Sequence, residues 1–235
     1  MGKKVLWLGG LLLCAAAVFM VVTHQGKDVI VTENERKLPG PLAGVTVCVD
    51  PGHGGYDGGA VGRDSGELEK TINLQLGKAL ETALKAQGAD VILTREKDIA
   101  LSDPGAERKR RDLKARVDAA QGADVFLSLH MNEYPDRAQS GPQVFYTADD
   151  AQSRLLAGAI QQSMNANLAP VRPRSAHTGD YYVLREQSLP AVLIECGFLS
   201  NAEEEKKLLS PEYQQLCAQS IVNGLIEYLH LANGA

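Results

Sequence analysis

The chain has 235 residues, with 24 lysines and arginines against 29 aspartates and glutamates, and a formal net charge of -5. Hydrophobic residues make up 44% of the sequence and charged residues 23%, a composition that excludes a disordered or fibrous protein and suits one globular domain. The acidic balance argues against a partner that is a nucleic acid, because proteins that bind nucleic acids usually present a net basic face.

The first feature in chain order is an apolar run, Val5–Val22, which follows the basic residues Lys3 and Lys4. As a helix, its roughly 18 residues would span about 27 Å, close to the hydrocarbon thickness of a bilayer. Residues 1–22 are interpreted either as a cleaved signal peptide or as an uncleaved signal-anchor, and the sequence leaves both open. The two lysines favour a cytoplasmic N-terminus, so we expect the rest of the chain to be exported, with membrane association at least before processing.

After this segment, residues 23–44 are polar and rich in turn formers, which predicts a linker. From residue 45 onward, short apolar runs alternate with longer segments of helical periodicity. Strands are predicted at Val45–Val49, Asp90–Thr94, Asp124–His130, Gln143–Thr147, Tyr181–Leu184 and Ala191–Glu195. Helices are predicted at Leu68–Gln87, Glu107–Ala120, Ala151–Asn167 and Pro211–Leu231. The alternation predicts one α/β domain over residues 45–235, with a largely parallel six-stranded sheet flanked by helices.

Chemically unusual residues follow three of the predicted strands, at the carboxyl ends where ligands gather in parallel sheets. The first strand runs into a glycine-rich loop that carries His53, the third ends at His130, and the last ends at Glu195. Either histidine alone is ordinary in a turn or a core, but an ionised carboxylate beside a core strand is costly unless it is paired or bound to a metal. Together the three residues predict a zinc site with three protein ligands and an open fourth position.

The third metal ligand is expected to be a carboxylate or another histidine, and the start of the first predicted helix offers two glutamates. Glu67 and Glu69 lie two residues apart and therefore cannot share a helix face. Glu69 falls on the apolar stripe that contains Ile72 and Leu76, whereas Glu67 falls on a more solvated side. Helical phase thus selects Glu69 as the inward carboxylate, and the alternative role for it is stabilisation of the helix dipole.

Five short motifs occur in a fixed order along the exported part of the chain. They are Val-Asp-Pro-Gly-His-Gly-Gly, Leu-Glu-Lys, Ser-Leu-His-Met-Asn, Tyr-Val-Leu-Arg and Ile-Glu-Cys-Gly-Phe-Leu-Ser-Asn. In this order they resemble the zinc-dependent N-acetylmuramoyl-L-alanine amidases of bacterial cell walls, the amidase-3 type. The resemblance implies one Zn²⁺ per chain, bound by His53, Glu69 and His130, with Glu195 as the catalytic carboxylate.

Within that family, the single-domain layout, the apolar N-terminal segment and the basic stretch Arg108–Lys114 resemble the germination-specific branch of spore-forming bacteria. This resemblance implies hydrolysis of the amide between N-acetylmuramic acid and L-alanine in spore-cortex peptidoglycan, as a step towards muramic-δ-lactam. The expected location is extracytoplasmic, in the cell wall or the spore intermembrane space. The partners would be glycan strands and stem peptides, and the need for a protein activator is left open.

Two other functions remain as alternatives to the amidase. An exported zinc carboxypeptidase or other peptidase acting on stem peptides would use a similar metal site. A non-catalytic wall-binding module would keep the fold without the reaction, but it gives no reason for a complete set of ligands.

Three polar residues are candidates for contacting the substrate. Asn132 follows His130 by two residues, His177 precedes the fifth predicted strand, and Arg185 follows that strand. The candidate roles are a hydrogen bond to the substrate for Asn132, assistance to the leaving group or a fourth contact for His177, and contact with stem-peptide carboxylates for Arg185. The alternatives are a loop cap for Asn132 and a solvated loop side chain for His177.

Overall fold

The computed structural model describes residues 40–234. The predicted signal peptide or anchor at residues 1–22 and most of the predicted linker at 23–44 lie outside these residues, so both stay predictions. Between residues 40 and 234, no helix is both long enough and apolar enough to cross a membrane. Residues 41–44 form a turn, and the Leu42 N–H donates a hydrogen bond of 3.0 Å to the Gln87 carbonyl.

Strands and helices alternate along most of the described chain. The strands are β1 (Thr46–Pro51), β2 (Asp90–Leu93), β3 (Val125–Asn132), β4 (Gln143–Tyr146), β5 (His177–Thr178) and β6 (Ala191–Phe198). The helices are α1 (Glu69–Ala86), α2 (Arg108–Ala119), α3 (Ala151–Leu168), α4 (Tyr182–Arg185), α5 (Ala202–Leu208) and α6 (Pro211–Asn233). All four predicted helices are therefore present, with ends displaced by no more than two residues.

The strands form one six-stranded sheet in the order β2-β1-β3-β6-β4-β5. β1 pairs in parallel with β2 and with β3, and β3 pairs in parallel with β6. β4 runs antiparallel to β6 and pairs in parallel with the short β5. The predicted single α/β domain with a largely parallel six-stranded sheet is confirmed.

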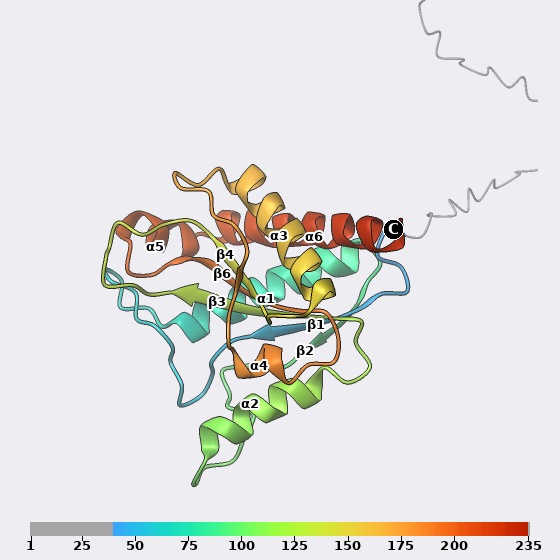
Figure 1. Ribbon diagram of the computed structural model, residues 1–235. Helices are drawn as coiled ribbons and strands as arrows, with labels where there is room; N and C mark the ends of the chain where they lie inside the picture. Colours follow the sequence, from blue (N-terminus) through green and yellow to red (C-terminus); the bar gives the residue numbers. More distant parts are fainter. Residues whose placement is uncertain (1–39, 235) are drawn as a thin grey trace, which may run out of the picture. The chain divides into compact units, whose positions relative to one another are not determined.

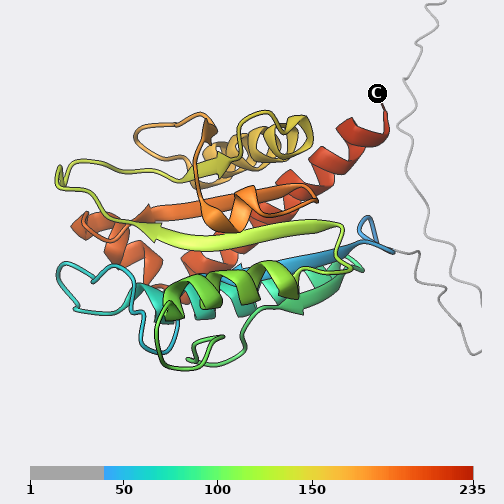
Figure 2. The ribbon, with the colours of Figure 1, turned by 60° about the horizontal axis from the view of Figure 1, so that its bottom comes forward.

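Helices cover both faces of this sheet (Figures 1 and 2). α1, α3 and α6 pack on one face and enclose the larger hydrophobic core, whereas α2 and α4 cover the other face over a smaller cluster. Along α1, Ile72, Leu76, Leu80 and Leu84 recur at every fourth position and are fully or almost fully buried. This spacing places them on one stripe, which is why the segment forms an amphipathic helix against the sheet.

The strands send alternate side chains to the two faces, as pleating requires. In β3, Leu129 points into the large core while His130 faces the side covered by α2 and α4. In β6, Ile194 and Glu195 divide between the two faces in the same way. Because β3 and β6 are parallel and pair His130 with Glu195, these two side chains lie next to each other on one face.

One predicted strand is wrong. A strand is predicted at Tyr181–Leu184, but Tyr182–Arg185 form the short helix α4. The two-residue strand β5, which the sequence does not predict, brings the sheet to six strands. The N–H groups of Leu184 and Arg185 both donate to the Tyr181 carbonyl, at 3.0 and 2.9 Å, and close a helical turn. A run of four aromatic and aliphatic residues is too short for periodicity to separate a strand from a helix.

Helix α5 is absent from the sequence expectations because its seven residues, AEEEKKL, carry no apolar stripe. Its start is set by Asn201, whose side chain accepts hydrogen bonds from the backbone N–H groups of Glu203 and Glu204. Asparagine is among the preferred N-cap residues because it satisfies these otherwise unpaired donors. α5 is thus specified by its cap and by its tertiary contacts rather than by a hydrophobic pattern.

The two ends of the described chain lie at the same end of the sheet. Gly40 contacts Gln87 and Gly88, just before β2 begins, and α6 finishes at Asn233 on that side (Figures 1 and 2). The carboxyl ends of β1, β3 and β6 are at the opposite end.

Candidate metal and catalytic site

β1 leads directly into the loop that carries His53, which has a positive φ of 61°. This left-handed conformation costs a residue with a side chain roughly 1–2 kcal/mol, so surrounding contacts must hold it. The buried guanidinium of Arg95 donates to the carbonyls of Pro51 at 2.8 Å and Gly52 at 2.9 Å. From the other side, Arg116 donates to the carbonyl of His53 at 2.7 Å. Two buried arginines therefore fix the loop backbone that presents His53.

Glu69 is the first residue of α1 and is only 3% exposed. One carboxylate oxygen accepts a hydrogen bond of 3.0 Å from the Met131 N–H, and the other accepts one of 2.8 Å from the Ala60 N–H. Asn73, one turn further along the helix, donates a third hydrogen bond to the same carboxylate at 3.2 Å. The inward orientation predicted from helical phase is confirmed, and the backbone of β3 and of the loop at Ala60 holds the carboxylate in place.

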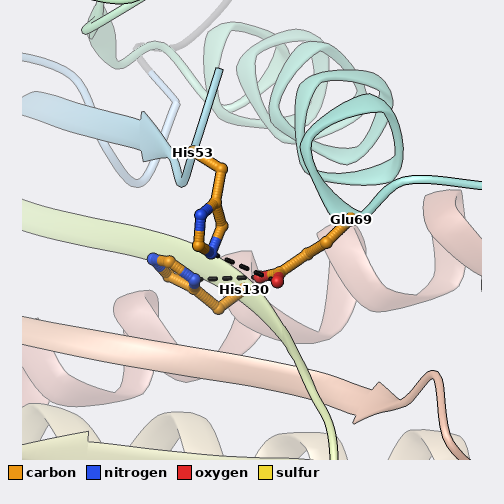
Figure 3. Close-up of side chains that lie close together, drawn as sticks. All are labelled: His53, Glu69 and His130. Carbon is orange, nitrogen blue, oxygen red and sulfur yellow. Dashed lines mark hydrogen bonds and ion pairs between the residues drawn. The ribbon is translucent and has the colours of Figure 1, made fainter. Parts of the chain in front are cut away.

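His53, Glu69 and His130 converge at the carboxyl ends of β1 and β3 (Figure 3). Nε2 of His53 lies 3.1 Å from one Glu69 oxygen, and Nδ1 of His130 lies 2.9 Å from the other. One nitrogen from each ring and one carboxylate oxygen all lie within 4.8 Å of one another. The structure thus brings together the three residues that the sequence selected, in an arrangement that could hold a metal ion.

Two glycines make room for this convergence. A Cβ on Gly52 would lie 2.3 Å from the ring of His130, and a Cβ on Gly59 would lie 2.4 Å from a Glu69 carboxylate oxygen. Contacts this short are sterically impossible without displacement of the neighbouring group, so a larger residue at either position would displace one of the three side chains.

Charge is strongly coupled among these side chains. Burial lowers the pKa of His53, but its contacts with Asp57 and Glu69 outweigh that effect and raise the pKa to about 9. Burial also raises the pKa of Glu69, yet the hydrogen bonds from His130 and His53 dominate and hold it well below the usual range. A bound cation would replace the protons that such a cluster otherwise retains, so metal binding would release protons.

Glu195 lies beside the cluster rather than in it. It is the register partner of His130 across β3 and β6, and its Oε2 atom is buried without a hydrogen-bond partner among the described residues. Burial raises its pKa to about 7, with a further increase from the negative charge of Glu69. A carboxyl group with a pKa near 7 and one oxygen without a hydrogen-bond partner can both accept and donate a proton.

A cavity of about 360 Å³ connects these groups. His53, His130 and Glu195 line one side of it, and residues of α2 and of the Asp180–Val183 segment line the other. A slightly larger cavity of about 400 Å³ lies nearby between Val61 and Tyr134, but neither the histidines nor Glu195 line it. The cavity of about 360 Å³ is therefore the one that chemistry at these groups would use.

The three predicted substrate contacts lie outside the lining of that cavity. Asn132 ends β3 and is half-buried, with its carbonyl accepting a hydrogen bond of 2.8 Å from the Leu199 N–H. His177 is exposed in β5, opposite Phe145. Arg185 ends α4 and lies within ion-pair distance of Asp180 and Glu186. It lines a separate cavity of about 290 Å³.

Sequence reasoning missed two groups that support the site. Asp57 places a carboxylate oxygen 2.9 Å from Nδ1 of His53, the nitrogen that faces away from Glu69. Asp50 in β1 is buried and accepts hydrogen bonds from Arg116 at 2.6 Å and Ser128 at 2.8 Å. The sequence does offer one signal for Asp50: it lies two residues after Cys48 and therefore on the same face of the predicted strand, just before the loop that carries His53. Its partner Arg116 has no sequence signal, because the two are 66 residues apart.

Comparison with known proteins gives one consistent result. The family described as N-acetylmuramoyl-L-alanine amidase, Amidase_3, matches residues 47–227. The germination-specific N-acetylmuramoyl-L-alanine amidase of Bacillus subtilis (strain 168) is 35% identical over 97% of this chain and 96% of its own length. The amidase LytC of the same organism is also 35% identical, over 89% of this chain but 40% of its own length.

Solved structures agree with these sequence matches. The CwlD amidase of Clostridioides difficile, solved in complex with the GerS lipoprotein, superimposes with a TM-score of 0.76 at 34% identity. That alignment covers 80% of this chain and 99% of the other. The catalytic domain of the N-acetylmuramoyl-L-alanine amidase CwlV from Paenibacillus polymyxa gives a TM-score of 0.69 at 34% identity, covering 79% and 98% of the two chains.

Proposed function

The chain belongs to the N-acetylmuramoyl-L-alanine amidases, and we propose that it is a zinc enzyme that removes stem peptides from spore-cortex peptidoglycan. Hydrolysis of the amide between N-acetylmuramic acid and L-alanine in peptidoglycan follows from the family. The metal, the roles of the individual residues and the cortex as the substrate are the parts proposed here. The observation that carries the proposal is the convergence of His53, Glu69 and His130 beside the unpartnered carboxylate of Glu195.

The donor set fits zinc. Zn²⁺ binds imidazole nitrogen and carboxylate oxygen, and catalytic sites commonly use three such protein ligands with an open fourth position. Bonds of about 2.1 Å at tetrahedral angles put donor atoms roughly 3.4 Å apart. Nε2 of His53 and Nδ1 of His130 lie 3.1 and 2.9 Å from different oxygens of Glu69, and one donor atom from each of the three residues lies within 4.8 Å of the other two. We therefore assign His53, Glu69 and His130 as the ligands of one zinc ion per chain.

The surrounding contacts support the same assignment. Ligating histidines usually have their second ring nitrogen next to a carboxylate or carbonyl, which fixes the tautomer and the ring orientation. Asp57 occupies that position for His53. The backbone N–H groups of Ala60 and Met131 orient the Glu69 carboxylate in the same manner.

Zinc bound at such a site lowers the pKa of a water ligand to about 7 and polarises a carbonyl oxygen. Glu195 would accept the proton of the attacking water and pass it to the nitrogen of the departing L-alanine. A pKa of about 7, raised by burial, suits both steps because the carboxyl is neither a very weak base nor a very weak acid at that pH. Asn132, His177 and Arg185 remain proposed substrate contacts further from this centre.

The cortex as the substrate rests on whole-length similarity. The germination-specific amidase matches this chain over 96% of its own length, whereas LytC has a large part that this chain does not match. The solved relative from C. difficile is a complex with a lipoprotein, so we propose that this chain also acts outside the cytoplasm with a protein partner. The product would then continue towards muramic-δ-lactam. Among the three functions that the sequence allowed, the comparisons support the amidase and neither the peptidase nor the wall-binding module.

Digestion of purified peptidoglycan tests this function. The purified protein is incubated with cortex peptidoglycan and, separately, with vegetative peptidoglycan, each with and without a chelator, and the products are identified by mass spectrometry. We expect intact stem peptides with a free L-alanine amine from cortex material, no release in chelator, and recovery when zinc is restored. Cleavage within the stem peptide, or release that a chelator does not affect, would refute the zinc amidase.

A further inference from the structure

The side chains of the basic stretch Arg108–Lys114, at the start of α2, have different surroundings in the structure. Arg108 stacks on the ring of Tyr56 at 3.8 Å, and Arg111 donates to backbone carbonyls of the preceding loop. Lys114 pairs with Asp118 one turn along the helix. Lys109 differs from these three: it lines the cavity that holds Glu195, and it makes no hydrogen bond or ion pair within residues 40–234.

The other charged groups around this cavity already have partners. Arg116 binds Asp50 at 2.6 Å and Asp112 at 3.0 Å, and both carboxylates are buried. Asp180 pairs with Arg185, and Asp57 lies against His53. Apart from the proposed catalytic carboxylate of Glu195, Lys109 is therefore the charged side chain of the cavity lining that is left to meet a ligand.

Contacts on both sides of Lys109 fix the part of α2 from which its side chain extends. The preceding residue, Arg108, rests on Tyr56, three residues after His53. Two turns further along, Arg116 donates to the His53 carbonyl. The helix is thus tied to the loop that carries the proposed zinc ligand.

The chemistry of the substrate distinguishes the two sides of the scissile amide. The carboxyl of muramic acid is consumed in that amide, so the glycan side of the bond is neutral there, whereas the stem peptide carries free carboxylates beyond its first alanine. Leu113, Val183 and Leu193 give the same cavity apolar surface that suits the alanine methyl group. A single uncommitted cation beside such a surface matches the peptide side better than the glycan side.

We propose that this cavity is the stem-peptide subsite and that the Lys109 ammonium binds the free carboxylate of the residue that follows L-alanine. The inference rests on the proposed amidase function and extends it, because it names the residue that selects an acidic peptide. It also separates Lys109 from Arg185, which lies in another cavity and is already paired with two carboxylates.

A matched pair of ligands tests this subsite. The zinc-loaded Glu195→Gln variant is titrated calorimetrically with N-acetylmuramoyl-L-alanyl-D-glutamate and with the corresponding D-isoglutamine compound, which has a carboxamide in place of that carboxylate. Adding Lys109→Met should weaken binding of the carboxylate ligand roughly five- to tenfold and leave the carboxamide ligand within about twofold. Lys109→Arg keeps the charge and should keep the preference. Arg110→Met is the matched control, since it removes one positive charge from an exposed position of the same helix.

Equal losses for the two ligands, or no loss for either, would overturn the assignment of Lys109. The proposed function is read separately, from hydrolysis of the same two compounds by the protein that retains Glu195. Hydrolysis of both compounds with an unchanged preference after Lys109→Met rejects only the subsite. Absence of hydrolysis together with a Lys109-dependent preference in binding rejects the proposed reaction and keeps the subsite.

Discussion

The two faces of the central sheet are built from the same strands but differ sharply in chemistry. On the face covered by α1, α3 and α6, the central strands contribute only apolar side chains, namely Val47, Val49, Leu127, Leu129, Val192 and Ile194. On the face covered by α2 and α4, the alternate positions of β1, β3 and β6 include Asp50, Ser128, His130 and Glu195. One face provides most of the hydrophobic stabilisation, and the other carries the groups to which we assign the reaction.

This division shows how a buried charged site is maintained in a stable domain. An ionised group in a protein interior is costly unless another charge or a hydrogen bond compensates it. Asp50 is compensated by Thr94, which directly follows β2, by Ser128 from β3 and by Arg116 from α2. α2 therefore acts mainly as a source of compensating charge, whereas α1 and α6 act mainly as apolar cover. Four experiments can break or sharpen this contrast.

The largest effect is expected from Glu195→Gln on the reactive face. The amide keeps the size of the side chain but cannot accept the proton of the attacking water, so turnover should fall by roughly 10²- to 10⁴-fold. Zinc content, measured by mass spectrometry of the metal, should stay at one ion per chain because Glu195 is not among the proposed ligands. Near-normal turnover with unchanged metal content would remove Glu195 from the mechanism.

Arg116→Met tests whether the charge network holds the reactive face together. The substitution leaves Asp50 and Asp112 buried without their cation and frees the His53 carbonyl. We expect a loss of about 3–5 kcal/mol in the free energy of unfolding, measured with urea, together with weaker zinc binding. Arg110→Met removes an exposed charge from the same helix and should change the unfolding free energy by less than about 0.5 kcal/mol. A loss of under about 1 kcal/mol for Arg116→Met would contradict this role.

Substitutions at two adjacent residues of β3, whose side chains lie on opposite faces of the sheet, compare the stability that each face contributes. Leu127→Ala creates a cavity in the large core and should cost about 3 kcal/mol of unfolding free energy while leaving zinc affinity unchanged. Ser128→Ala removes one hydrogen bond to Asp50 on the other face and should cost about 1 kcal/mol. Urea titration of both variants, with zinc affinity measured in parallel, gives the comparison. A larger stability loss from Ser128→Ala than from Leu127→Ala would invert it.

The pH dependence of Glu195 gives the smallest effect. In the metal-free site burial raises its pKa to about 7, and a neighbouring Zn²⁺ would lower it, so kcat/KM of the zinc enzyme should fall up to tenfold per pH unit below a midpoint under 7. Zinc-bound water titrates in the same range. The infrared C=O band of the protonated carboxyl, measured in metal-free protein, therefore assigns the group. This band should grow as the pH falls through about 7 and be missing in Glu195→Gln.

Much of this arrangement could be predicted from the sequence. The helices show long periodic patterns, and the phase of α1 was enough to choose Glu69 over Glu67. α4 was mistaken for a strand because four residues carry no usable period, and α5 was missed because its helix depends on a cap and tertiary contacts. The Asp50–Arg116 pair and the cavity position of Lys109 could not be predicted, since each depends on how α2 packs onto the sheet.

The placement of the described chain ends has a practical consequence. The start of the described chain, beside the amino end of β2, and the carboxyl end of α6 both lie opposite to the carboxyl ends of β1, β3 and β6 (Figures 1 and 2). An affinity handle joined after α6 would therefore immobilise the domain on a solid support with its cavity directed at the bathing solution. Insoluble sacculus fragments, which cannot diffuse into a matrix, could then reach the reactive groups from the unobstructed side.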